Sequence, residues 1–182
     1  MIYTLYYVHD PMCSWCYAFK STLDTLKKHL DSNIKLVYVV GGLASHSDEI
    51  IPKDMQEKIE NIWYEIEENT GAKFNHDFWK NCKPRRSTYL ACQATILARY
   101  ENKEDEMINA IQEAYYLKAL NPSDASTLIE LAKQIGMNAK KFEEDLKSQK
   151  IEEDLQNELN FRRSLNVRSF PSLILKYKKE LY

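Results

Sequence analysis

The sequence lacks the features that mark membrane, secreted and nucleic-acid-binding proteins. Its 182 residues contain no run that approaches the roughly 18 apolar residues of a membrane span. The N-terminal stretch MIYTLYYV carries no Lys or Arg and alternates in polarity, unlike a secretory signal. A formal net charge of -2 gives no basic surface for a nucleic acid. We therefore expect a cytoplasmic protein without a membrane or nucleic-acid partner.

Cysteine is scarce, with four residues in the whole chain. This number is too small for a secreted scaffold held together by disulfides. Cys13 and Cys16 nevertheless lie only three positions apart, in the stretch HDPMCSWCYAF. In a reducing compartment, such a C-x-x-C pair is more often catalytic or metal-binding than structural. The spacing by itself leaves three readings open: a redox-active dithiol, half of a zinc site, or two inert thiols.

The first 42 residues have the pattern of a strand, a helix and a second strand. Residues 2–8 are aromatic and β-branched, and 14–30 carry apolar residues at helical spacing. Residues 34–42 are almost continuously apolar and end in two glycines, which is typical of a strand buried on both faces. This order predicts a right-handed βαβ unit with a parallel pair of strands.

The rest of the chain is predicted to be almost wholly helical before it returns to a strand. We expect a helix that begins at Pro52 and stops at Gly71, and three helices capped by Ser87, Ser123 and Asn138. Two further helices are expected over 104–120 and 152–165, followed by a strand in SFPSLILKY. A composition of 44% hydrophobic and 29% charged residues is typical of a soluble domain with one substantial core.

The position of the cysteine pair favours redox chemistry. Cys13 falls at the start of the first predicted helix, where the partial positive charge and unpaired N–H groups stabilise a thiolate. A cysteine at such a site can have its pKa lowered from about 8.5 to roughly 3.5–7.5. Cys16 lies one helical turn later on the same face, within disulfide reach. We therefore predict that Cys13 is the nucleophile and Cys16 the resolving thiol, a chemistry that requires no metal and no organic cofactor.

The zinc reading needs two further ligands, and the candidates are His76, Cys82 and Cys92. A second C-x-x-C pair, which would be strong evidence for zinc, is absent from the sequence. Cys92 falls on the predicted inward face of a helix, where cysteine commonly behaves as a small apolar residue. A disulfide between Cys82 and Cys92, or a second redox pair, is a further alternative.

Together, these segments resemble the thioredoxin superfamily. The features that carry the resemblance are the first strand, DPMCSWCYAF, the second strand, the helical block and SFPSLIL. The large insertion is similar to the DsbA-like branch, and D-P-M-C-S-W-C is most similar to the FrnE-like predicted protein-disulfide isomerases. The resemblance implies an α/β thioredoxin fold with a large all-helical insertion. The fold would occupy 1–45 and 150–182, with its C-terminal end incomplete, and the insertion 46–149.

The same resemblance implies a function and a second half of the site. The chain is expected to be a thiol–disulfide oxidoreductase or isomerase that works through a mixed disulfide on protein or small-molecule thiols, glutathione included. Pro171 would be a cis-proline that faces the cysteines, and the backbone of Phe170 would pair with the substrate. Met12, Ser14 and Trp15 complete the predicted substrate-binding residues.

Several alternatives remain at this point. Hydroxychromene-carboxylate isomerases and kappa-class glutathione transferases share the fold and bind glutathione, but carry a serine in place of Cys13. A non-enzymatic zinc-binding domain is the other alternative. His9 and Asp10 could assist proton transfer or satisfy turn hydrogen bonds. An exposed sheet edge after Pro171 would allow a homodimer to form.

Overall fold

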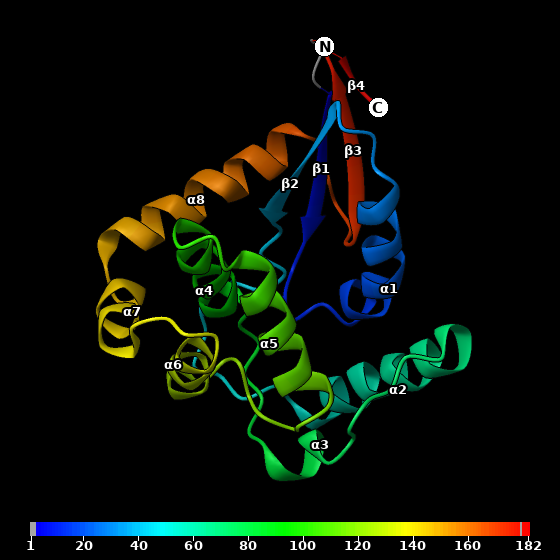
Figure 1. Ribbon diagram of the computed structural model, residues 1–182. Coiled ribbons are helices and arrows are strands. Elements are labelled where there is room, and N and C mark those ends of the chain that lie inside the picture. Colours follow the sequence, from blue (N-terminus) through cyan, green and yellow to red (C-terminus); the bar gives the residue numbers. More distant parts are fainter. Residues whose placement is uncertain (1–2, 179) are drawn as a thin grey trace.

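The computed structural model describes residues 3–178 and 180–182. Within this part of the chain, the strands form one mixed sheet in the order β2-β1-β3-β4 (Figure 1). The strands are β1 (Tyr3–His9), β2 (Ile34–Val40), β3 (Ser172–Tyr177) and β4 (Glu180–Leu181). β1 runs parallel to β2 and antiparallel to β3, which confirms the predicted parallel pair. The two ends of the chain therefore share one sheet.

Helices make up most of the rest of the chain. They are α1 (Ser14–His29), α2 (Lys53–Thr70), α3 (Phe78–Asn81), α4 (Tyr89–Tyr100), α5 (Glu104–Tyr116), α6 (Ala125–Gln134), α7 (Ala139–Leu146) and α8 (Gln149–Ser164). The short helix α3 was not predicted from the sequence. Figure 1 shows α2 to α7 gathered beyond the ends of β1 and β2, where the loop to α1 also lies.

Different helices cover the two faces of the sheet. The ring of Tyr6 meets that of Phe161 on α8 at a centroid distance of 5.1 Å. Side chains alternate along a strand, so Tyr7 points to the opposite face. There its ring lies 6.1 Å from that of Phe19 on α1. The sheet is thus held between α8 and the helix that begins at the cysteine pair.

Most of the buried apolar side chains lie in the helical part. Trp63 of α2 is the centre of an aromatic group and contacts the rings of four other buried residues at centroid distances of 5.0 to 5.8 Å. These rings belong to Phe74, Phe78, Tyr115 and Tyr116. Met12, from the loop between β1 and α1, belongs to the same core. The loop that carries the cysteines therefore packs directly on the helical part.

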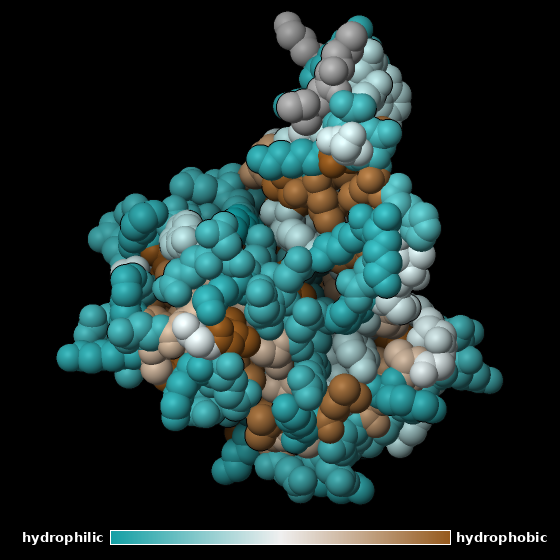
Figure 2. All heavy atoms as spheres, in the orientation of Figure 1, coloured by the Kyte–Doolittle hydropathy of each residue, from teal (hydrophilic) through white to brown (hydrophobic). Residues whose placement is uncertain are grey.

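The prediction that the second strand is buried on both faces is wrong. β2 is an edge strand with only β1 beside it, and only Val39 and Val40 are buried. A continuous apolar run is found in central strands, but here the first part of β2 lies in the end of the sheet that projects from the rest of the molecule (Figure 2). The predicted first residue of β1, Ile2, lies outside the described residues.

Two of the predicted helix caps are shifted by one residue. α4 is capped at Thr88 instead of Ser87, and α6 at Asp124 instead of Ser123. The hydroxyl of Ser123 donates to the backbone carbonyl of Ser87 at 3.0 Å and so is not used as a cap. The predicted cap at Asn138 is confirmed, because its side chain accepts the backbone N–H of Lys141 at 3.0 Å.

Helix boundaries elsewhere differ by a few residues. α5 ends at Tyr116 instead of residue 120, since Ala119 adopts a positive φ of 53°, through which a helix cannot continue. Pro52 precedes the first turn of α2, and Gly71 ends that helix in the left-handed conformation, as predicted. The last long helix begins at Gln149, capped by Ser148, three residues before the predicted start at 152.

The division into a thioredoxin domain over 1–45 and 150–182 and an insertion over 46–149 remains our proposal. It agrees with the placement of all strands near the two ends of the chain. Among the described residues, no helix combines the length and apolar character needed to cross a bilayer.

Two isoleucines of α2 provide a matched test of this core. Ile66 is fully buried, whereas Ile62 on the same helix is 37% exposed. Ile66→Ala should lower the free energy of unfolding by about 2–5 kcal/mol, because it deletes buried methyl groups and leaves a cavity. Ile62→Ala should cost less than about 1 kcal/mol. Urea denaturation of both variants measures the difference, and equal losses would contradict the described packing.

Candidate functional site

The cysteine pair lies at the junction of β1 and α1. Cys13 is the N-cap of α1, with an extended backbone, and no side chain caps the helix there. Its own N–H donates to the carbonyl of Asp10 at 3.0 Å, and its carbonyl accepts the N–H of Tyr17 at 3.0 Å. The predicted position at a helix start is therefore confirmed. The first N–H groups of α1 point toward the Cys13 sulfur, where they favour a negative charge.

The two thiols are both buried but differ in acidity. A hydrogen bond from the Cys16 thiol lowers the pKa of Cys13, against the opposing effect of burial, and the N–H groups of Cys16 and Trp15 act in the same direction. Burial raises the pKa of Cys16 well above its ordinary value, and its hydrogen bond to Cys13 adds to this. Cys13 is thus the thiol that ionises first, and Cys16 stays protonated beside it.

The loop before β3 lies next to the cysteine pair, although it is near the C-terminal end of the sequence. The Cys13 thiol donates to the carbonyl oxygen of Phe170 at a sulfur–oxygen distance of 3.8 Å. The Phe170–Pro171 peptide bond is cis. The structure therefore brings together Cys13, Cys16, Phe170 and Pro171, which are far apart in the sequence.

The remaining predicted substrate residues differ in accessibility. Trp15 is 38% exposed, so its side chain is accessible at the surface. Ser14 is half-buried, and so are Phe170 and Pro171. Met12 is buried in the main core.

Asp10 is a buried carboxylate that ties the site to the helical part. It accepts hydrogen bonds from the N–H of Met12 at 2.9 Å and of Leu43 at 2.7 Å. It also accepts the Thr88 hydroxyl at 2.7 Å and the Cys92 thiol at 3.5 Å. Burial raises the pKa of Asp10, while these four hydrogen bonds oppose that rise. Asp10 thus meets the turn hydrogen bond expected from the sequence and adds partners from α4 that no local pattern signals.

His9 has no hydrogen bond to either thiol. It is fully buried, and neither ring nitrogen has a hydrogen-bond partner. Burial lowers the pKa of His9 to about 3, so the imidazole is neutral at physiological pH. Its ring stacks on that of Tyr7 at 5.1 Å. The idea that His9 assists proton transfer therefore finds no contact that supports it.

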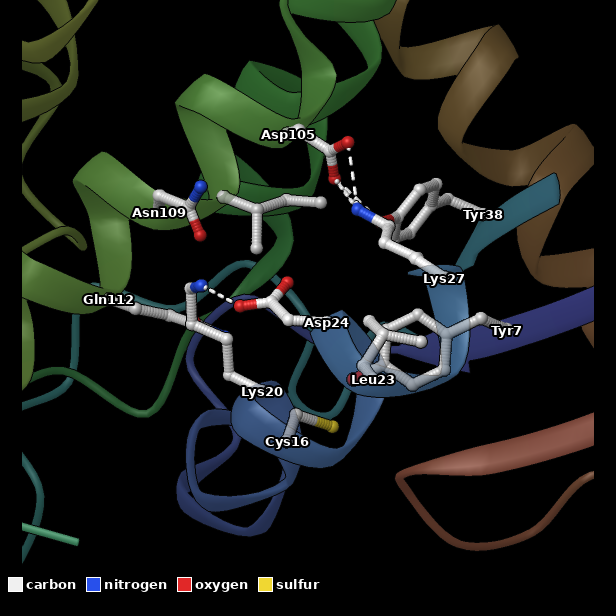
Figure 3. A pocket seen from close by; sticks show the side chains of 11 residues that line it. Tyr7, Cys16, Lys20, Leu23, Asp24, Lys27, Tyr38, Asp105, Asn109 and Gln112 are labelled. Carbon is white, nitrogen blue, oxygen red and sulfur yellow. Dashed lines mark hydrogen bonds and ion pairs between the residues drawn. The ribbon is translucent and has the colours of Figure 1, made fainter. Parts of the chain in front are cut away.

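A small cavity borders the buried thiol of Cys16 (Figure 3). Its volume of about 20 Å³ is surrounded by residues from α1, α5 and the strands β1 and β2. The Tyr7 hydroxyl, which lines it, is hydrogen-bonded to the Cys16 sulfur. Gln112 also lines it, with a buried side-chain oxygen that has no hydrogen-bond partner. The Lys20–Asp24 ion pair, at 2.5 Å, borders the cavity on the side of α1.

The candidate zinc ligands each have other partners. The Cys82 thiol donates to the Ala119 carbonyl at 3.1 Å, and His76 lies between Glu60 at 3.1 Å and Glu67 at 3.3 Å. Cys92 is buried against Asp10, as its predicted inward position requires. All four cysteines are free thiols, so no disulfide joins Cys82 to Cys92. Across residues 3–178 and 180–182, no three His, Cys, Asp or Glu side chains gather as a metal site would require.

Comparison with known proteins agrees with this architecture. A thioredoxin family model matches residues 6–180. The cytosolic disulfide reductase DsbM from Pseudomonas aeruginosa is 19% identical, with a TM-score of 0.81 over 98% of this chain and 87% of that one. A candidate protein disulfide isomerase from Nitrosomonas europaea is 20% identical, with a TM-score of 0.87 over 100% and 88%. These matches confirm the predicted DsbA-like thioredoxin fold.

The curated proteins that match the sequence are described as adapter proteins and not as disulfide oxidoreductases. The ClpXP adapter protein SpxH from Halalkalibacterium halodurans is 22% identical over 176 residues, which cover 93% of this chain and 57% of the relative. The protein of the same name from Bacillus subtilis is 22% identical over 172 residues, with coverages of 93% and 56%. The chain therefore spans little more than half the length of the curated relatives it matches.

The charge of Asp10 can be tested through the acidity of Cys13. An ionised Asp10 raises the pKa of Cys13 by repulsion. Asp10→Asn removes this charge, so the rate of Cys13 alkylation should reach half its maximum at a lower pH. The variant should also lose about 1–3 kcal/mol of stability, because buried donors lose a charged acceptor.

Asp31→Asn, in the exposed turn after α1, is the matched control and should leave the alkylation profile unchanged. An Asp10→Asn profile that coincides with that of the wild type would show that the Asp10 charge does not act on Cys13.

Proposed function

The chain belongs to the thioredoxin family, and on that premise we propose that it catalyses thiol–disulfide exchange through Cys13 and Cys16. The observation that carries the proposal is that the pKa values of the two thiols are shifted in opposite directions. Cys13, at the N-terminus of α1, has a lowered pKa, whereas that of buried Cys16 is raised. A thiolate is the attacking species in exchange, and only one of the pair needs to be ionised at the start.

The proposed reaction begins at the Cys13 sulfur. Its thiolate attacks one sulfur of a substrate disulfide, a new S–S bond forms, and the other substrate sulfur leaves as a thiolate that takes up a proton. Cys16 then loses its proton and attacks the Cys13 sulfur. The mixed disulfide breaks, the substrate leaves fully reduced, and the enzyme holds a Cys13–Cys16 disulfide. Two electrons have passed to the substrate, and the reverse sequence oxidises a dithiol.

The second step requires the proton of buried Cys16 to leave. The cavity beside Cys16 has room for about one water molecule, and its polar neighbours supply the partners that such a water needs. The hydrogen bond between the Tyr7 hydroxyl and the Cys16 sulfur and the nearby Lys20–Asp24 pair support a route from the thiol to solvent on this side. We assign the proton transfer to this cavity, and no step to His9.

The substrate would lie along the surface between Trp15 and the loop at Phe170 and Pro171. Exposed Trp15 suits an apolar group of the substrate, and half-buried Ser14 lies next to it. The Phe170 carbonyl, already within reach of Cys13, is the proposed partner of the substrate backbone. Met12 would contribute through the position of its backbone, because its side chain belongs to the core.

Small thiols such as glutathione are a proposed substrate class besides proteins, and one of the similar structures supports them. A structure of DsbM from Pseudomonas aeruginosa with GSH is 18% identical to this chain, with a TM-score of 0.78. The rival glutathione-dependent isomerase is represented by 2-hydroxychromene-2-carboxylate isomerase, 14% identical with a TM-score of 0.70. The intact dithiol at Cys13 and Cys16 favours exchange over that chemistry. A cytoplasmic location and a homodimer remain predictions from the sequence.

A second candidate function is that of an adapter, which is favoured by the description of the curated relatives. An adapter needs a surface that binds a partner but no reactive thiol. The defined hydrogen bonds around Cys13 and the buried Cys16 are not required by such a role, so we place exchange first.

Serine variants with oxidised glutathione as the probe test the proposed exchange. Cys16→Ser should accumulate a mixed disulfide with one glutathione on Cys13, because the resolving thiol is absent. The wild type should release it, and Cys13→Ser should form no adduct at the site. Intact-protein mass spectrometry measures each species.

Cys82→Ser is the control, since Cys82 lies in the helical part and its thiol donates a hydrogen bond to a backbone carbonyl. It should behave like the wild type. Failure of Cys16→Ser to form an adduct at Cys13 would contradict the proposed function.

A further inference from the structure

Gly41 lies in unusually close contact with Phe170. It follows the last residue of β2, and its N–H donates to the carbonyl of His9 at 2.5 Å, which joins the ends of β1 and β2. A β-carbon at position 41 would lie 2.4 Å from both Cε1 and Cζ of the Phe170 ring, and 2.9 Å from Cδ1. Carbon atoms in contact are normally 3.5–4.0 Å apart. Only glycine allows the ring to lie where it does.

The Phe170 ring is held on its other sides as well. It packs against a small hydrophobic cluster formed by Val8, Val39, Leu165 and Val167. The guanidinium of Arg162 lies over the ring, 5.8 Å from its centroid. The half-buried side chain of Phe170 is therefore held between β1, β2 and the end of α8, and a group added at position 41 would push against it.

The backbone of the same residue faces the nucleophile. The Phe170 carbonyl accepts the hydrogen bond from the Cys13 thiol at 3.8 Å. A hydrogen bond from the protonated form of an acid stabilises that form and opposes ionisation. The place of the ring and the place of the carbonyl are coupled, because both belong to Phe170 and the following Pro171 restricts the backbone of that residue.

We infer that Gly41 is a positioning residue for Cys13. Its missing side chain lets the Phe170 ring lie against the end of β2, and the seated ring sets the distance between the Phe170 carbonyl and the Cys13 sulfur. The inference deepens the proposed function and rests on it, because it concerns the same nucleophile. A residue at the end of the edge strand β2 thereby controls the contact between Cys13 and the Phe170 carbonyl, which comes from the loop before β3.

The test is a double-mutant cycle between positions 41 and 170. Gly41→Ala should displace the ring and its carbonyl, and so weaken the hydrogen bond that holds Cys13 protonated. The midpoint of the pH profile for Cys13 alkylation by iodoacetamide should then fall by roughly 0.3–1 pH unit. Peptide-level mass spectrometry assigns the modified thiol.

Phe170→Leu supplies the second arm of the cycle. Leucine lacks Cε1 and Cζ, the two ring atoms that would lie nearest to a β-carbon at position 41, and its Cδ1 can move away by rotation of the side chain. Adding Gly41→Ala to Phe170→Leu should therefore leave the midpoint of that variant unchanged. Gly71→Ala is the control for general destabilisation, because Gly71 has a positive φ of 73° and no neighbour within 4 Å where a β-carbon would be. It should lose stability without a change in the Cys13 profile.

Two results would overturn the inference. One is a folded Gly41→Ala protein with the wild-type midpoint. The other is an equal shift on both backgrounds, since the effect would then not pass through Phe170. If Gly41→Ala alone does not fold, the double variant should recover the fold, and its failure to do so would also refute the inference. The alkylation profile needs no disulfide substrate, so it gives an answer whether or not exchange activity is found.

Discussion

The hydrogen bond from the Cys16 thiol to the Cys13 sulfur is the contact on which the rest of the site depends. It lowers the pKa of Cys13 in a position where burial alone would raise it. The same burial keeps Cys16 protonated, so that it can donate the bond. The pair therefore carries one negative charge, which lies mainly on the Cys13 sulfur because this sulfur is at the N-terminus of α1.

The fold fixes that contact from several directions at once. β1 directs the chain into α1, and β3 pairs with β1 so that the Phe170 carbonyl lies over Cys13. Asp10 holds the intervening loop to α4 through Thr88 and to the segment after β2 through Leu43. The helical part therefore supports the nucleophile directly, through a buried carboxylate, as well as forming the larger core.

Local signals in the sequence predicted much of this arrangement. The βαβ unit, the start of α1 at the cysteine pair and the cap at Asn138 each depend on residues within a few positions of one another. The exposure of β2 could not be predicted, because a run of apolar residues does not reveal whether a strand has one neighbour or two. The partners of Asp10 and the contact of Gly41 with Phe170 join residues far apart in the chain, and no local pattern records them.

The ionisation of Cys13 in the wild-type protein is the most direct measurement of the central claim. The rate of iodoacetamide modification at Cys13 is followed against pH, and the midpoint gives its pKa. A midpoint below the value of about 8.5 for a free cysteine is expected, with Cys16 unreactive over the same range. A midpoint at or above that value would contradict the assignment of Cys13 as the ionised nucleophile.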